Sequence, residues 1–276
     1  MFCKLLKHEW KDNSKLLWIL TACVAGIAVL ATVLMRIFFP MLLQMEESEN
    51  LFFFAMPVLA LFLVAYFSIL AYSIVVHYVM LFRFYKNRFT DRGYLMFTLP
   101  VKTHYHFTVP AVHMLLWSLL SLLVTVACAS LLMFVGFDWN TITGGEDVIR
   151  EIFSIFEIFF SDSFATGYLA TLIVTGIVDL VSSIVIPMAC VSVASVIAKK
   201  HKILVSIGLI YGVSVVMGII QYVISMIPMM MLFAGTGNDE VTMILVQVCS
   251  WIMPVILTVV GYVLSVKLMK KKLNLP

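Results

Sequence analysis

The chain alternates between long apolar runs and short segments that carry almost all of its charge. A transmembrane helix needs about 20 mostly apolar residues, because it must cross about 30 Å of hydrocarbon at a rise of 1.5 Å per residue. Six runs are long enough, roughly Leu16–Phe39, Leu51–Phe82, Thr108–Phe137, Phe164–Ala198, Ile203–Phe233 and Val241–Val266. We therefore predict an all-α integral membrane protein with six transmembrane helices, forming a single transmembrane domain over residues 1–276.

The basic residues are distributed unevenly between the two ends of these spans. Sixteen of the 18 lie in the N-terminal segment, the second-to-third loop, the fourth-to-fifth loop and the C-terminal tail. The alternate loops hold only Arg36 and Arg150, together with eleven of the acidic residues. Because loops rich in Lys and Arg remain on the cytoplasmic side, both termini are predicted to be cytoplasmic.

Two segments outside the spans show the pattern of amphipathic helices. In residues 1–15, Trp10 and its apolar neighbours occupy one arc of a helix, while Lys11 and the other lysines occupy the opposite arc. This pattern predicts an amphipathic helix at the inner membrane interface before the first span. Residues 138–163 include a similar segment with apolar Phe153 opposite Glu157, which predicts an extracellular amphipathic helix. The alternative for both is a solvated helix packed against the bundle.

The composition excludes several classes of protein. Hydrophobic residues make up 63% of the chain and charged residues only 12%, whereas soluble domains average about 45–50% and about 25%. A soluble enzyme, a disordered protein and a nucleic-acid binder are therefore excluded. The five cysteines are scattered, and the histidines near residue 106 have no Cys or acid at ligand spacing, so we predict no disulfide framework and no metal site.

No catalytic motif is present in the sequence. The phosphate-binding string G-x-x-x-x-G-K-[ST], the zinc motif H-E-x-x-H and the G-x-S-x-G elbow are all absent. We therefore expect a protein that is not an enzyme and binds no cofactor directly. If the protein moves a substrate across the membrane, the energy comes from an ion gradient or from a separate subunit.

Three ionisable residues inside or beside the spans are candidates for a substrate path, because a charge within the bilayer is costly and often functional. Asp179 lies near the middle of the fourth span, and helical spacing predicts that it points into the bundle beside Thr175 and Ser182. It either lines a cavity or fastens helices through neighbouring hydroxyl groups. Arg36 either contacts substrate or extends outward to the acidic loop, and His77 either lines the path or is a packing residue.

Small and polar residues form stripes along the last two spans. The stripe in the sixth span follows spacings of three and four, and the fifth span contains a Gly208–Gly212 pair. Such stripes allow helices to approach closely. They indicate packing within the bundle or, alternatively, dimerisation.

The most informative segment is the second-to-third loop, residues 83–107, which mixes cations with aromatic residues. Thr90 or Asp91 could cap a short helix that Pro100 would end. Its exposed apolar side chains suit a helix that docks in a groove of another protein. The alternative is a polybasic loop bound to anionic lipid.

This loop resembles a family signature. The string from Asp91 to Lys102, Asp-Arg-Gly-Tyr-Leu-Met-Phe-Thr-Leu-Pro-Val-Lys, is similar to the "acid…Gly-Tyr-Leu…Thr-Leu-Pro-Val" signature of bacterial ABC exporter permeases. These permeases belong to the second ABC permease superfamily and have the type V exporter fold. The opening Leu5–Lys11 resembles the start of the same family. Glu9 falls within the apolar arc of the N-terminal helix, so either this acid has a polar partner in the protein or the helix is less regular than the pattern predicts.

The resemblance implies a function and a set of partners. The loop would be the coupling helix that contacts a separate ATPase subunit, and the N-terminal helix with Glu9 would border it. ATP and Mg²⁺ would be held by that ATPase. The chain would pair with a second permease subunit, the same or related, in lipid of a bacterial plasma membrane, and would bind no nucleic acid. The coupling residues implied are Asp91, Arg92, Gly93, Tyr94, Leu95, Phe97, Leu99, Pro100 and Glu9.

The preferred hypothesis is therefore a permease subunit of an ATP-driven exporter for a hydrophobic or amphipathic substrate, such as a peptide, a drug or a lipid-like molecule. A gradient-driven secondary transporter that uses Asp179 is the alternative. An intramembrane enzyme is a third hypothesis, for which the sequence provides no catalytic constellation.

Overall fold

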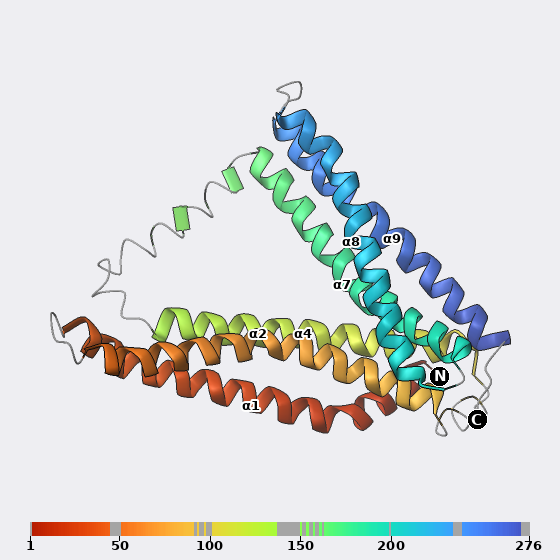
Figure 1. Cartoon of the computed structure of the whole chain (residues 1–276), viewed down its shortest axis with the longest axis horizontal. Helices are drawn as coiled ribbons and strands as arrows, with labels where there is room; N and C mark the ends of the chain where they lie inside the picture. Colours follow the sequence, from red (N-terminus) through yellow and green to blue (C-terminus); the bar gives the residue numbers. More distant parts are fainter. Residues whose placement is uncertain are drawn as a thin grey trace. The chain divides into compact units, whose positions relative to one another are not determined.

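The computed structural model describes residues 2–44, 51–90, 93, 97, 101–136, 150, 153, 154, 157, 160, 161, 163–198, 200–233 and 239–271. These residues form long helices, and none of them lies in a strand. The helices are α1 (Phe2–Gln44), α2 (Leu51–Phe89), α4 (Tyr105–Gly136), α7 (Ser163–Ile197), α8 (Lys202–Phe233) and α9 (Asp239–Lys271) (Figure 1). All six are long and apolar enough to cross a membrane, so the chain is a multi-pass membrane protein, as the sequence predicts.

Several helices extend beyond the predicted spans. α2 continues to Phe89 and α4 begins at Tyr105, so Arg83, Lys86 and Arg88 lie on the last turns of α2 rather than in a loop. Basic side chains at this end interact favourably with the helix dipole. The predicted loop 83–107 is therefore shorter in the structure, and only residues 90–104 connect the two helices.

The N-terminal segment is continuous with the first span. α1 has no break near residue 15, and the buried positions Glu9, Asn13, Leu17 and Thr21 recur every four residues along it. A single buried stripe of this period is typical of one helix packed along its length. The separate interfacial helix expected over residues 1–15 is therefore not confirmed. The predicted helix in residues 138–163 lies mostly outside the described residues.

The chain forms two packed units, and α1, α2 and α4 contribute to both. One unit comprises Met1–Lys7, Leu81–Leu115 and Ile158–Pro276, and the other comprises His8–Met80 and Leu116–Glu157. We call them the C-terminal unit and the N-terminal unit. The single transmembrane domain inferred from the sequence stays a prediction.

In the N-terminal unit, the long parts of α1, α2 and α4 pack side by side (Figure 1). The hydroxyl groups of Thr21 and Tyr72 lie 2.6 Å apart and join α1 to α2. Trp117 of α4 is fully buried, and its ring centroid lies 5.1 Å from that of Trp10 and 5.6 Å from that of Trp18. These three indoles hold α4 against α1.

In the C-terminal unit, α7, α8 and α9 pack against one another (Figure 1). The Gln247 Nε2 and the Trp251 Nε1 of α9 both donate to the Thr175 hydroxyl of α7, at 2.6 Å and 2.7 Å. Gln221 of α8 donates to the backbone carbonyl of Ser250 in α9. Inter-helix hydrogen bonds of this kind fasten helices where the surrounding lipid offers no partner.

The small-residue stripe of α9 packs within the chain. A Cβ atom at Gly261 would lie 3.1 Å from the Cβ of Ala189 in α7, and Ser265 is fully buried. The interpretation of this stripe as bundle packing is therefore confirmed at these positions. Gly208 and Gly212 of α8 differ, because both are exposed and a Cβ atom there would meet nothing within 4 Å.

Candidate functional site

The base of the segment between α2 and α4 is a buried polar pair. Arg88, near the end of α2, has only 1% of its surface exposed, and its Nη1 lies 3.4 Å from the Nδ1 of His106 on the first turns of α4. The Phe97 ring also packs on His106, with its centroid 4.7 Å from that of the imidazole. A residue in the middle of the segment thus packs against the start of α4.

The residues next to this pair along α2 and α4 include aromatic rings that pack on one another. The Phe84 centroid lies 5.6 Å from that of Phe89 and 6.2 Å from that of Phe107, both nearly perpendicular to it. Phe107 in turn packs edge-on against Tyr262 of α9 at 5.6 Å. Edge-to-face pairs of this kind contribute about 0.5–1.5 kcal/mol beyond their burial. We call Phe84, Arg88, Phe89, Phe97, His106 and Phe107 the loop-base cluster.

The described part of the segment begins with a turn. The Gly93 N–H donates to the Thr90 carbonyl at 2.7 Å, and Gly93 and Phe97, four residues apart, both have helical backbone conformation. The Thr90 hydroxyl donates back to the carbonyl of Lys86. The Thr90 side chain therefore bonds to the last turn of α2, and its backbone carbonyl accepts the bond that begins the next turn. Capping of a short helix by Thr90 or Asp91 stays a prediction.

Of the residues predicted to contact a partner in this segment, Gly93 and Phe97 are described, and Phe97 belongs to the loop-base cluster. Gly93 is buried and Phe97 is half-buried. The other predicted positions in the segment lie outside the described residues: Asp91, Arg92, Tyr94, Leu95, Leu99 and Pro100.

Glu9, the predicted partner residue in α1, is buried with 5% of its surface exposed. It makes an interaction within the chain, and the identity of a polar partner stays a prediction. In the C-terminal unit the start of α1 reaches the start of α4, where Phe2 packs edge-on against Tyr105 at 5.9 Å. The first turns of α1 thus lie beside the helix that follows the segment.

Asp179 lies on the surface of the C-terminal unit. Its side chain is exposed, with Gly176 and Ser183 on the same exposed face of α7, so it does not point into the packing of its own unit. The Thr175 hydroxyl accepts a hydrogen bond from Trp251 of α9. The Ser182 hydroxyl donates to the backbone carbonyl of Asp179 at 3.0 Å, not to its side chain. The structure therefore gives no support to a helix-fastening role through these hydroxyls.

The other two path candidates belong to the N-terminal unit. Arg36 is exposed near the end of α1 and makes an interaction within the chain. His77 is half-buried in α2, and its ring lies edge-on to that of Tyr78 at 6.0 Å. Since Asp179 belongs to the C-terminal unit, no single unit holds all three residues. Among the described residues, no group of three His, Cys, Asp or Glu side chains could hold a metal ion.

Sequence reasoning did not single out Arg88, His106, Phe107 or Tyr262 as parts of the site. Arg88 looked like one of several solvated cations in a polybasic loop, and nothing in its neighbours along the chain distinguishes it. The only available signal is the spacing of four that places Phe84 and Arg88 on one helix face.

Comparisons of the chain with protein-family models, with curated proteins and with solved structures found no match.

Proposed function

We propose that this chain is the membrane-spanning permease subunit of an ATP-driven ABC exporter in a bacterial plasma membrane. It forms the path for a hydrophobic or amphipathic substrate together with a second permease subunit. Separate ATPase subunits bind residues 90–104 between α2 and α4, and Glu9 of α1 is the further partner residue that the resemblance implies. Those subunits bind ATP and Mg²⁺, because this chain has no phosphate-binding motif of its own.

The observation that carries this proposal is the anchoring of the segment at the loop-base cluster. A loop that only attracts anionic lipid needs cations but no fixed shape. Here Phe97 packs against His106, and Phe107 packs against Tyr262 of α9. His106 and Phe107 are consecutive residues, so a displacement of Phe97 would reach α9 through the start of α4.

Purification of the full-length chain from its native membranes tests the proposal directly. We expect an ATPase subunit to be recovered in a near-stoichiometric amount, together with a second permease chain. A chain that is purified without any ATPase but transports substrate when driven by an ion gradient would contradict the proposal. That result would favour the secondary transporter.

The orientation of the spans is tested by cysteine accessibility. We expect replacements at Glu47, Glu151 and Asn238 to react with a membrane-impermeant reagent from outside the cell. Replacements at Asn87 and Lys200 should react only after permeabilisation, because basic segments remain inside. The six-span orientation would be wrong if either set showed the opposite labelling.

Asp179 is the observation that favours the second candidate, a gradient-driven transporter. An exposed carboxyl group in the middle of a span is costly unless it faces water or a partner. If it lines the path, Asp179→Asn should reduce transport at least about tenfold, a barrier change of about 1.4 kcal/mol, with assembly unchanged. The matched control is Ser183→Ala on the same exposed face, which should transport normally. Near-normal transport by Asp179→Asn would exclude the path role.

The ATP-driven and gradient-driven candidates predict different energy requirements for the same measurement. In sealed vesicles, transport by the exporter should stop when ATP is withheld and continue when the ion gradient is collapsed. The secondary transporter predicts the reverse.

A further inference from the structure

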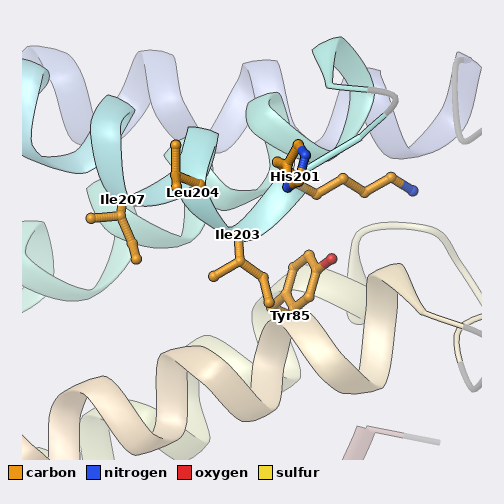
Figure 2. Close-up of a pocket in the computed structure, with 6 residues that line it drawn as sticks. Tyr85, His201, Ile203, Leu204 and Ile207 are labelled. Atoms are coloured by element: carbon orange, nitrogen blue, oxygen red, sulfur yellow. The ribbon is translucent and has the colours of Figure 1, made fainter.

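A pocket lies at the start of α8, outside the loop-base cluster. It has a volume of about 520 Å³ and is lined by Tyr85 of α2 and by five residues at the start of α8: His201, Lys202, Ile203, Leu204 and Ile207. All of these residues belong to the C-terminal unit. Figure 2 shows the Tyr85 ring pointing from α2 toward Ile203, with Leu204 and Ile207 further along α8. The volume falls within the range of about 300–1,000 Å³ that is usual for ligand sites.

One end of the pocket suits an anion. α8 begins at Lys202, and its first internal bond at this end runs from the Val205 N–H to the His201 carbonyl. The amides just before Val205 therefore have no carbonyl of their own helix to bond, as at every helix N-terminus. The dipole of this 32-residue helix adds positive potential. Lys202 and the Tyr85 hydroxyl supply further donors in the same pocket.

The opposite end of the pocket is apolar and leads along the span. Leu204 and Ile207 line the pocket and are 72% and 63% exposed. Tyr211, four residues after Ile207, continues the same face of α8 with 71% of its surface exposed. Residues at spacings of three and four lie on one side of a helix. An apolar track therefore runs from the cationic end of the pocket down the side of a membrane-spanning helix.

We propose that this pocket binds an anionic phospholipid, with its phosphate at the start of α8 and an acyl chain along the apolar track. The charge of the lining selects the lipid class: its described residues include Lys202 and His201 but no acid, so none of them would hold the cationic group of a zwitterionic lipid. Basic pockets between transmembrane helices are suited to anionic head groups. The apolar wall has no function for inorganic phosphate, which needs only the cationic end. This inference does not depend on the proposed transport function.

The test uses the full-length chain in lipid nanodiscs of phosphatidylcholine with increasing fractions of phosphatidylglycerol. Native mass spectrometry measures the phosphatidylglycerol that stays bound. We expect the double variant His201→Gln, Lys202→Gln to bind this lipid about tenfold more weakly, because it loses charge-assisted contacts to the phosphate. The matched control is Lys267→Gln, Lys270→Gln, which removes two exposed lysines of α9 and should change binding by less than about twofold.

A second variant tests the pocket without changing any charge. Ile207→Trp should fill the cavity and weaken phosphatidylglycerol binding to a similar extent, and Tyr85→Phe should weaken it less because only one donor is lost. If the double variant does not fold, these two variants still test the proposal. Each variant is compared with the unsubstituted chain by size-exclusion chromatography.

Three results would overturn the proposal. If the α9 control lost as much binding as the double variant, the attraction would be diffuse and not located in the pocket. If Ile207→Trp bound phosphatidylglycerol normally, the cavity would not be the site. If millimolar inorganic phosphate displaced the lipid from the unsubstituted chain, the site would be one for a soluble phosphate.

Discussion

Replacing Tyr94 and Phe97 together with alanine is expected to release the ATPase subunit while the membrane helices stay folded. A helix seated in a partner groove derives most of its affinity from a few buried anchors, each of about 2 kcal/mol or more. Loss of two such anchors would weaken binding by about three orders of magnitude. Removal of Phe97 also removes the ring that packs on His106 at 4.7 Å. The measurement is ATPase recovery in a pull-down from membranes, together with substrate-stimulated ATP turnover.

Two control variants separate this expectation from the lipid-binding alternative. Phe153→Ala with Phe160→Ala removes two aromatic side chains that are 70% and 69% exposed, and it should leave ATPase recovery unchanged. Lys86→Gln with Lys102→Gln removes exposed charges at the two ends of the segment. If the segment only bound anionic lipid, this second pair would have the larger effect.

Arg88 is a poor choice for such a charge test, although the sequence placed it in the polybasic loop. Only 1% of its surface is exposed, so its removal would change buried polar interactions as well as the charge of the segment. Normal ATPase recovery and normal ATP turnover in the Tyr94 and Phe97 double variant would contradict the coupling assignment.

Trp117→Ala is expected to lower the free energy of unfolding by about 3–5 kcal/mol. Trp117 has no exposed surface and packs against Trp10 and Trp18, with centroids 5.1 Å and 5.6 Å away. In a membrane, helices are held together largely by close packing rather than by the hydrophobic effect. The cavity left by the indole would therefore remove contacts that lipid does not replace. A denaturant titration of the purified chain in detergent measures the change.

Trp117→Phe is the matched variant for this prediction. The Trp117 indole N–H makes no hydrogen bond to the residues that the structure describes, so phenylalanine keeps an aromatic ring and loses little polar interaction. We expect this variant to be less destabilised than Trp117→Ala by at least about 2 kcal/mol. Equal stability of both variants and the unsubstituted chain would show that the three indoles do not hold α1 and α4 together.

The sequence by itself determined the all-helical fold and the number of candidate spans. Both are local properties, because a span is set by the length of an apolar run measured against the thickness of the bilayer. The packing role of the α9 stripe was also predictable. Small residues at helical spacing, such as Gly261, allow a close approach that the structure places at Ala189.

The sequence did not determine the helix ends or the environment of single charged residues. Arg88 and Lys86 look alike in the sequence, yet Arg88 is buried beside His106 and Lys86 is exposed. Asp179 shares a helix with Thr175, but only Thr175 bonds to α9. Only the tertiary structure decided these differences, because the burial of a polar side chain depends on helices that are distant in the sequence. An apolar run defines a membrane span without defining which side of it meets a neighbouring helix.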